Sequence, residues 1–374
     1  MTPPPTLADV RAAVRDPGAD PDRAGAAEQA RARWATRAKP PGSLGRLEAA
    51  AVRLAAITGR CPPPVPAAPA VVVFAGDHGV VADGASAWPS EVTAAMVAAM
   101  AGGGAAINAF ATTVGATMTV VDVGIAGDLS GLLPATPFRA VEDAAGDVPG
   151  GPEPVVVLDR RVRSGTGSIA REPAMARSEA IAALEVGIRQ ATAAIDAGAD
   201  LLVGGDMGIG NTTPSAALIA WATGRPSDDL VGRGAGLPDA GLDRKRALVR
   251  AALTRVGGVE DPLDVLAGIG GLEIAALAGL HLAAAARRVP AIVDGVIGAA
   301  ALCVAEALAP GTAAHAVAGH RSVEPASVVA LEHLGLEPLL DLDLRLGEGT
   351  GACLAIPLVQ AACRALRDMA DLPS

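Results

Sequence analysis

The chain contains 374 residues, 51% of them hydrophobic, and this length and composition allow one large domain with a sizeable core plus a smaller domain. Its formal net charge is −10, with 40 acidic against 30 basic residues, and aromatic residues make up only 2%. Because nucleic-acid binding depends on Lys and Arg side chains that neutralise phosphates, we expect no nucleic-acid partner. Any phosphate that this protein binds must be held locally, by backbone N–H groups and one or two cations.

Cysteine usage and the N-terminus bear on the cellular location. None of the four cysteines belongs to a C-x-x-C motif or to a Cys/His cluster with metal-ligand spacing (Cys61, Cys303, Cys353 and Cys363). We therefore expect no metal site, and we interpret the cysteines as small buried hydrophobic residues in a reducing cytoplasm. The N-terminus lacks the apolar segment of a signal peptide, and no apolar stretch is expected to reach the roughly 20 residues that span a bilayer. The sequence predicts a cytoplasmic protein without a membrane partner.

The two ends of the chain are expected to be helical. Residues 1–38 are rich in Ala and Arg and predict one or two amphipathic helices, and residues 39–48 predict a turn followed by a helix to about Thr58. The Pro-rich stretch CPPPVPAAP at 61–69 is the clearest candidate for a domain boundary. Residues 350–369 predict a C-terminal helix, which could pack with the N-terminal helices into a small bundle.

Between these ends, short β-branched runs alternate with Ala-rich helical stretches. The strand candidates are residues 70–75, 118–124, 154–158, 200–204, 290–294 and 315–319. Continuous apolar strands separated by helices are typical of a parallel sheet that is covered on both faces, so we predict a doubly wound α/β domain. In such folds ligands bind outside the carboxyl ends of the strands, and several candidate strands end directly in Gly, Asp or His.

A glycine-rich turn at 204–214 (GGDMGIGNTTP) lies between the fourth strand candidate and a helix. Glycines at such a turn let the backbone approach a ligand, and the N-terminus of the following helix favours an anion. The spacing nearly matches a P-loop, but Asn211 stands where the phosphate-binding Lys should be, which argues against a nucleoside triphosphatase. The alternative is a plain tight turn in which Asn211 or Thr212 caps the helix.

A second glycine loop, GRGAG at 232–236, is followed by Lys245. A single glycine loop is weak evidence for a binding site, and a single lysine usually lies on a solvated face. Together, however, two glycine loops and one cation could hold a phosphate monoester without a metal.

Two further motifs each contain an ionisable residue. The first strand candidate ends in GDHGV at 76–80, where His78 is a candidate catalytic acid or base, although a histidine satisfied within a turn also fits the pattern. The motif GIGGLE at 268–273 lacks the strand-to-helix context of a dinucleotide site, and its Glu273 could be a structural cap partner.

Glu348 lies between two glycines in LGEGTGA at 346–352. The neighbouring residues have no side chains that would shield it or pair with it. It is therefore either part of a surface turn or a carboxylate directed into a cleft, and the pattern alone fits both interpretations.

Together, these segments resemble the nicotinate-nucleotide–dimethylbenzimidazole phosphoribosyltransferase family, which works in assembly of the lower ligand of cobalamin. The resemblance covers most of the chain, from about residue 39 to residue 363. It rests on several motifs in the family's order, namely KPPGSLGRLE (39–48), GDHGV (76–80), GDMGIGNTTP (205–214), GIGGLE (268–273) and RLGEGTGA (345–352).

The resemblance implies a mainly parallel, Rossmann-like α/β domain with a small helical domain built from both chain ends. We accordingly assign residues 1–66 and 351–374 to the small helical domain, and residues 67–350 to an α/β domain that binds a nucleotide and a base. The resemblance also implies a homodimer without a cofactor.

The resemblance further implies a set of site residues. Glu348 aligns with the family's catalytic glutamate, and Lys245 and Asp206 fall where the family has a lysine and a glutamate at the active site. Asp206 is one methylene shorter than that glutamate, and Trp88 stands where smaller residues are expected around the base. The other candidates for substrate binding are Asp77, His78, Met207, Gly208, Asn211, Thr212, Gly232, Gly234 and Gly347.

The reaction implied by the family moves the phosphoribosyl group of nicotinate mononucleotide to 5,6-dimethylbenzimidazole, giving α-ribazole 5′-phosphate and nicotinate. Glu348 would accept the proton of the base, and because no pyrophosphate leaves, the reaction needs no magnesium site. Two alternatives stay open. The chain could transfer the same group to a different aromatic acceptor, or it could be a non-catalytic nucleotide-binding module on the same fold.

Overall fold

The core of the protein is a six-stranded parallel sheet, seen in a computed structural model that describes residues 4–129 and 155–372. Its strands are β1 (Pro69–Gly76), β2 (Thr117–Gly124), β3 (Val156–Asp159), β4 (Leu201–Met207), β5 (Ala291–Val293) and β6 (Ala316–Ala318). They lie in the order β3-β2-β1-β4-β5-β6, and all neighbours are parallel. Each strand candidate thus overlaps a strand, although several ends differ, and residue 154 lies outside the described residues. The predicted α/β fold is confirmed.

The strand order reverses between β1 and β4, which are neighbours in the sheet but far apart in the chain. At such a switch point a crevice forms outside the carboxyl ends of the strands. Polar residues stand at or just after these ends, as the sequence analysis expected (Asp77 after β1, Asp206 in β4, Asp294 after β5 and His320 after β6). The topology therefore gathers side chains that are distant in sequence.

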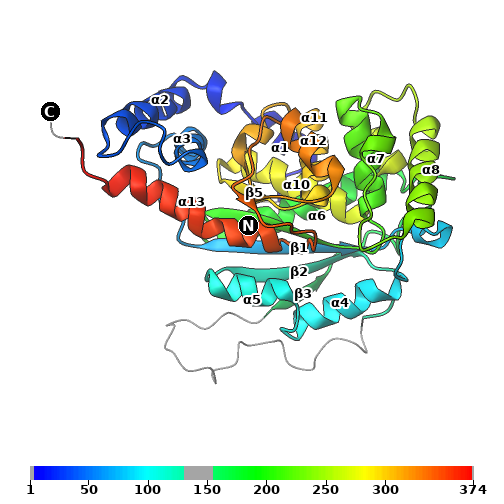
Figure 1. Cartoon of the computed structure of the whole chain (residues 1–374). Helices are drawn as coiled ribbons and strands as arrows, with labels where there is room; N and C mark the ends of the chain where they lie inside the picture. The colour runs from blue at the N-terminus through cyan, green and yellow to red at the C-terminus, as the bar shows by residue number, and fades with distance from the viewer. Residues whose placement is uncertain (1–3, 130–154, 373–374) are drawn as a thin grey trace.

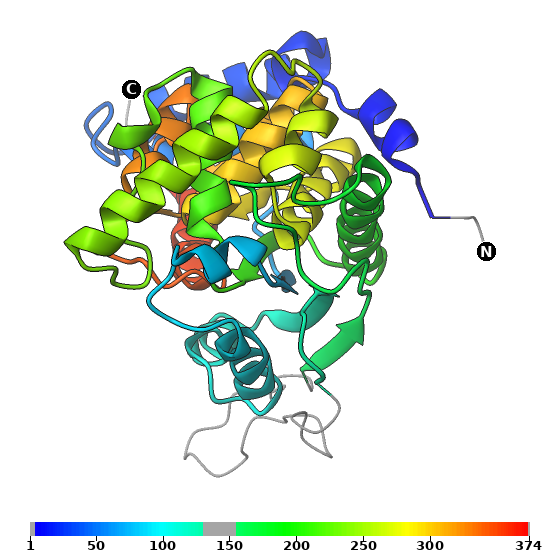
Figure 2. The ribbon, with the colours of Figure 1, turned by 90° about the vertical axis from the view of Figure 1, so that its right-hand side faces the viewer.

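Helices cover both faces of the sheet (Figures 1 and 2). Residues 70, 72 and 74 of β1 belong to one core cluster and residues 71, 73 and 75 to another, because alternate side chains of a strand point to opposite faces. The larger cluster includes α6 (Arg177–Asp196), α7 (Thr212–Thr223), α9 (Pro262–Ile269), α10 (Leu272–Arg287) and α11 (Val296–Leu308). The other includes α4 (Glu91–Ala101), α5 (Ala106–Thr113) and α13 (Thr350–Asp368).

The remaining described elements lie around these layers. Helix α8 (Asp239–Arg255) packs on α7, and α12 (Pro325–His333) packs on α7 and α11. The strands β7 (His320–Arg321) and β8 (Leu340–Asp341) form a small parallel sheet of their own, which the sequence analysis did not anticipate. Short 3-10 helices are found at Pro17–Ala19, Gly79–Asp83, Ser227–Asp229 and Ala313–His315.

Both chain ends are helical. Helices α2 (Pro21–Thr36) and α3 (Arg46–Thr58) lie at one end of the molecule with the C-terminal part of α13 (Figure 1), around their own cluster of Ala30, Trp34, Ala50, Ala51, Ala55, Ala362 and Leu366. Helix α1 (Leu7–Ala13) instead packs on α6 and α10 and belongs to the larger core. The assignment of residues 1–66 and 351–374 to one small helical domain stays a prediction.

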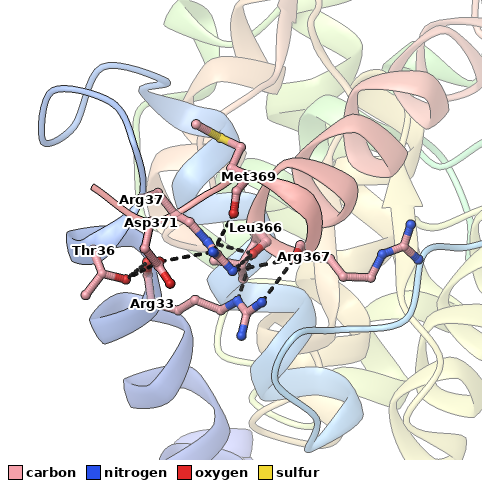
Figure 3. A network of polar contacts seen from close by, with 7 residues as sticks. All are labelled: Arg33, Thr36, Arg37, Leu366, Arg367, Met369 and Asp371. Atoms are coloured by element: carbon pink, nitrogen blue, oxygen red, sulfur yellow. Dashed lines mark hydrogen bonds and ion pairs between the residues drawn. The ribbon is translucent and has the colours of Figure 1, made fainter. Parts of the chain in front are cut away.

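A network of hydrogen bonds ties the end of α2 to the end of α13 (Figure 3). Arg37 is buried, and its guanidinium donates to the carbonyl oxygens of Leu366 and Met369. Arg33 donates to the carbonyl oxygens of Leu366 and Arg367. Because the last carbonyl groups of a helix have no partner within it, the two cations satisfy these acceptors and balance the negative end of the helix dipole.

Among the described residues, the stretch Glu91–Thr113 is long and apolar enough to cross a membrane, by length and composition only. This finding corrects our expectation that no apolar stretch reaches that length. The structure divides the stretch into α4 and α5, with three glycines between them, and both helices pack on the sheet. Its apolar side chains thus contribute to a core cluster.

We predict that Arg37→Ala lowers the free energy of unfolding by about 1–3 kcal/mol, because it removes the donor to the Met369 carbonyl oxygen and one of the two side chains that donate to the Leu366 carbonyl oxygen. Denaturant unfolding would measure the change. Arg31→Ala, at an exposed position of the same helix, is the control and should change stability by less than about 0.5 kcal/mol. An Arg37→Ala variant as stable as the wild type would show that the network does not hold α13 to α2.

Candidate functional site

A pocket opens at the carboxyl ends of the central strands, where the switch point predicts it. Its volume is about 820 Å³, including space open to solvent. Both glycine loops line it, through residues 206–212 and residues 233–235. The rest of its wall is formed by residues 85–87, 295–297 and 345–347 together with Leu237, His320, Ser322 and Glu324.

Glu348 lies in a strained loop that packs on β4. Its φ of 64° is a left-handed conformation that residues with side chains rarely adopt, and Gly347 and Gly349 have φ values of 84° and 90°. A Cβ on Gly205 would lie 2.3 Å from the carbonyl oxygen of Glu348, so this approach requires glycine at position 205. The glycines of two separate motifs therefore fix the position of one carboxylate. Strain of this kind costs roughly 1–3 kcal/mol and is concentrated at functional sites.

The carboxylate of Glu348 is buried, with the residue only 3% exposed. Its Oε2 accepts a hydrogen bond from the backbone N–H of Ile107, at the start of α5 (3.3 Å). Burial raises the pKa of this carboxyl, the Ile107 N–H partly offsets the rise, and the nearby carboxylate of Asp294 adds to it. Glu348 itself is not part of the pocket wall, whereas the adjacent Gly347 is.

Asp206 lies in the pocket wall at the end of β4 and is 5% exposed. Its Oδ2 accepts a hydrogen bond from Asn211 Nδ2 (2.9 Å), so Asn211 stands at the cap position of α7 without capping it. Burial raises the pKa of Asp206 well above its usual range, and the nearby carboxylates of Asp294 and Glu273 raise it further. Asp206 therefore places a carboxyl group in the pocket wall, where it can hydrogen-bond to a ligand.

Lys245, on α8, is fully buried and joins the two glycine loops. Its Nζ donates to Thr212 Oγ1 at the start of α7 (2.7 Å) and to the carbonyl oxygen of Gly232 (3.0 Å). Glu324 Oε1 accepts a hydrogen bond from the N–H of Gly234 (2.8 Å). Burial lowers the pKa of Lys245 to about 8, and the attraction of Glu324 partly offsets this shift.

Asp77 and His78 are buried and lie outside the pocket wall. Asp77 Oδ2 accepts a hydrogen bond from the backbone N–H of Ala126 (2.8 Å), and His78 Nε2 lies 2.8 Å from Glu273 Oε1. Burial lowers the pKa of His78, but the carboxylates of Glu273 and Asp77 outweigh it, so the pKa is raised overall. A direct contact of Asp77 or His78 with a substrate stays a prediction.

Trp88 is 53% exposed and is not part of the pocket wall, although residues 85–87 are. Its indole N–H donates to the carbonyl oxygen of Ala235 (3.4 Å), which links this segment to the second glycine loop. A contact between Trp88 and a bound base stays a prediction. Five of the other candidates line the pocket, namely Met207, Gly208, Thr212, Gly234 and Gly347. Gly232 lies beside it.

Several residues of the site were not among those predicted from the sequence. Asp294 Oδ1 accepts a hydrogen bond from the N–H of Ala352 (2.9 Å), which fixes the start of α13 next to the Glu348 loop. Ser322, Glu324 and Arg345 line the pocket. The sequence held a signal for Asp294, Ser322 and Glu324. Asp294 ends the fifth strand candidate, and the segment 320–324 directly follows the sixth.

Two glycine loops, an uncapped helix start, a buried cation and buried carboxylates at a switch point are typical of an α/β enzyme that acts on a nucleotide. Within residues 4–129 and 155–372, no group of three or more His, Cys, Asp or Glu side chains is arranged to hold a metal ion.

Comparisons with known proteins identify the family. A family model described as phosphoribosyltransferase matches residues 19–374. The nicotinate-nucleotide–dimethylbenzimidazole phosphoribosyltransferase of Salinispora tropica is 52% identical and that of Chloroflexus aggregans 49%, and the matches cover 90% and 92% of each chain. The crystal structure of this enzyme from Thermus thermophilus matches with a TM-score of 0.82 at 46% identity, over 93% of this chain and 96% of that one. The chain belongs to the nicotinate-nucleotide–dimethylbenzimidazole phosphoribosyltransferase family.

Family membership confirms the resemblance drawn from the sequence motifs, and it confirms the prediction of a phosphoribosyltransferase enzyme. The family model, which begins at residue 19, covers α2, α3 and α13 as well as the sheet.

We predict that Gly205→Ala destabilises the fold, because a Cβ at this position meets the Glu348 carbonyl oxygen and the side chain of Val73 (2.9 Å). Overpacking of this kind costs about 1–3 kcal/mol, which denaturant unfolding would measure. The control is Gly25→Ala in α2, where a Cβ meets nothing within 4 Å and alanine is the better helix former. Equal stabilities of the two variants would contradict the tight seating of the Glu348 loop on β4.

Proposed function

We propose that this chain transfers the phosphoribosyl group of nicotinate mononucleotide to 5,6-dimethylbenzimidazole, with Glu348 as the catalytic base. The products are nicotinate and α-ribazole 5′-phosphate, a component of the lower ligand of cobalamin. Family membership supports the reaction. The observation that carries the role of Glu348 is its buried carboxylate, which a strained loop holds next to the pocket wall.

The reaction requires bond exchange at one carbon and the removal of one proton. The ring nitrogen of nicotinate is cationic in the nucleotide, so it keeps the electron pair of the breaking bond and nicotinate leaves without receiving a proton. A lone pair of the benzimidazole then bonds to the anomeric carbon, and the proton on its other nitrogen passes to Glu348. Attack from the face opposite nicotinate inverts the configuration and gives the α-product.

The electrostatics of the site favour this sequence. Positive charge develops on the anomeric carbon, and carboxylates fixed nearby in a desolvated pocket stabilise it more strongly than water does. The raised pKa of Glu348 makes its ionised form a better proton acceptor than an ordinary carboxylate. General-base assistance of this kind contributes about 10²–10⁴-fold to a rate.

We further propose that the nucleotide phosphate binds between the two glycine loops. The start of α7 lacks a side-chain cap and therefore offers backbone N–H groups to an anion. Lys245 supplies positive charge at Thr212, and the side chains of Arg233 and Arg345 line the same pocket. These groups together form a local anion site. Such a site is needed because the chain as a whole is negatively charged and does not attract a phosphate by itself.

The acceptor base, the homodimer and the cytoplasmic location are further parts of the proposal. A panel of 5,6-dimethylbenzimidazole, other benzimidazoles, adenine and a phenol, each mixed with nicotinate mononucleotide, would identify the acceptor by nicotinate release. Absence of nicotinate release with every acceptor would favour a non-catalytic binding module. Light scattering would test the homodimer.

We predict that Glu348→Gln and Glu348→Ala each lower kcat by about 10²–10⁴-fold, because neither side chain accepts the proton of the base. Nicotinate release measures kcat, and calorimetry should show that the nucleotide still binds. Glu332→Gln, an exposed position on α12, serves as the control and should retain wild-type kcat. Near-normal turnover in either Glu348 variant would remove this residue from the mechanism.

We predict that the affinity for nicotinate mononucleotide falls as the pH rises through about 8, because Lys245 loses its positive charge there. The lysine is charged below its pKa, so binding is strongest on the acid side of this step. Lys245→Ala should weaken binding by about tenfold or more and should abolish the step. Calorimetry across the pH range would measure both effects, and an unchanged Kd in Lys245→Ala would contradict the assignment.

A further inference from the structure

Two motifs that contribute nothing to the pocket wall meet beside it. His78, from GDHGV, follows β1, and Glu273, from GIGGLE, lies in the first turn of α10, 195 residues away in sequence. His78 Nε2 lies 2.8 Å from Glu273 Oε1, and the two side chains are 1% and 0% exposed. The carboxylates of Glu273 and Asp77 raise the pKa of His78 in spite of burial, so they favour an ion pair over a neutral hydrogen bond at this contact.

The ion pair lies directly against the first glycine turn. A Cβ on Gly208 would lie 3.2 Å from His78 Nε2 and 2.4 Å from the carbonyl oxygen of Gly76. A Cβ on Gly271 would lie 2.5 Å from His78 Cε1 and 2.8 Å from Glu273 Oε2. Glycine at these two positions makes room for the imidazole ring, and the ring packs against the loop formed by residues 207–210.

Stability alone does not account for a charged pair at this position. The desolvation of two buried charges offsets their attraction, and apolar residues of similar volume often stabilise as well or better. Among the described residues, no group hydrogen-bonds to His78 Nδ1 or Glu273 Oε2, which adds to the cost of burial. By contrast, burial lowers the pKa of His281, on the same helix, to about 4, so that imidazole is buried in its neutral form.

We propose that His78 and Glu273 are positioning residues for the nucleotide. Their ion pair holds the turn at residues 207–210, and with it Asp206 and the start of α7, in the arrangement that receives the phosphoribosyl group. This inference rests on the proposed function, since it assumes that the turn binds the nucleotide. The loop of Glu348 has supports of its own, in Gly205 and Asp294, so we expect the pair to act on the nucleotide more than on the acceptor base.

The two substrates of the enzyme provide an internal control for this proposal. Glu273→Leu keeps the volume but removes the ion pair, and it should raise the KM for nicotinate mononucleotide about tenfold or more while the KM for the base and kcat stay within about threefold. Glu273→Gln keeps a polar contact with His78 and should raise the same KM less. His281 lies on the same buried helix but does not contact His78 or Glu273. His281→Leu should therefore change stability and leave both KM values as in the wild type.

A Glu273→Leu variant with the wild-type KM for the nucleotide would overturn the proposal. Equal rises in both KM values, or the same rise in His281→Leu, would assign the pair to general stability and would overturn it too. If Glu273→Leu does not fold, Glu273→Gln and His78→Gln decide the question by the same comparison of KM values. Failure of the wild type to release nicotinate with any acceptor would instead refute the proposed function, and the Kd for the nucleotide in these variants would then test the pair.

Discussion

The carboxyl end of β4 carries the contact on which the site depends. Gly205 has no side chain, and the carbonyl group of Glu348 occupies the space that a Cβ would fill. The loop reaches this place because α13 begins next to β5, where Asp294 accepts hydrogen bonds from Gly349 and Ala352. One close backbone contact and one buried carboxylate thus bring the C-terminal part of the chain to the switch point of the sheet. The left-handed conformation of Glu348 follows from its contact with Gly205, and the surrounding fold maintains this strain.

The sheet was predictable from the sequence, because continuous β-branched runs with helices between them have few solutions other than parallel strands. The rule that ligands bind at the carboxyl ends also pointed to the region of the pocket. The two-residue strands β7 and β8 are too short to produce any pattern. The contact of His78 with Glu273 was not predictable either, since it joins segments 195 residues apart and depends on how α10 packs against β1.

Glu348 shows more clearly what the local sequence does not determine. Glycine neighbours fit an exposed turn and a buried carboxylate equally well, and only packing against β4 distinguishes them. The resemblance placed Trp88 around the base, and the structure shows it 53% exposed with its indole N–H on the second glycine loop, a contact that the local sequence does not indicate. Asn211 and Thr212 were candidate helix caps, yet their side chains contact Asp206 and Lys245. In each case tertiary contacts, which local patterns do not encode, decide between two local possibilities.

The buried carboxyl groups of the site work against the stability of the fold. Burial raises the pKa of Asp206, Asp294 and Glu348, so the folded chain binds their protons more tightly than the unfolded chain does. A group with a raised folded pKa contributes stability below its unfolded pKa and loses that contribution as the pH rises through its folded value. Ionisation of these groups is therefore unfavourable for folding, although the proposed reaction needs negative charge near the anomeric carbon. The large apolar core and the hydrogen bonds that join α2 to α13 outweigh this cost.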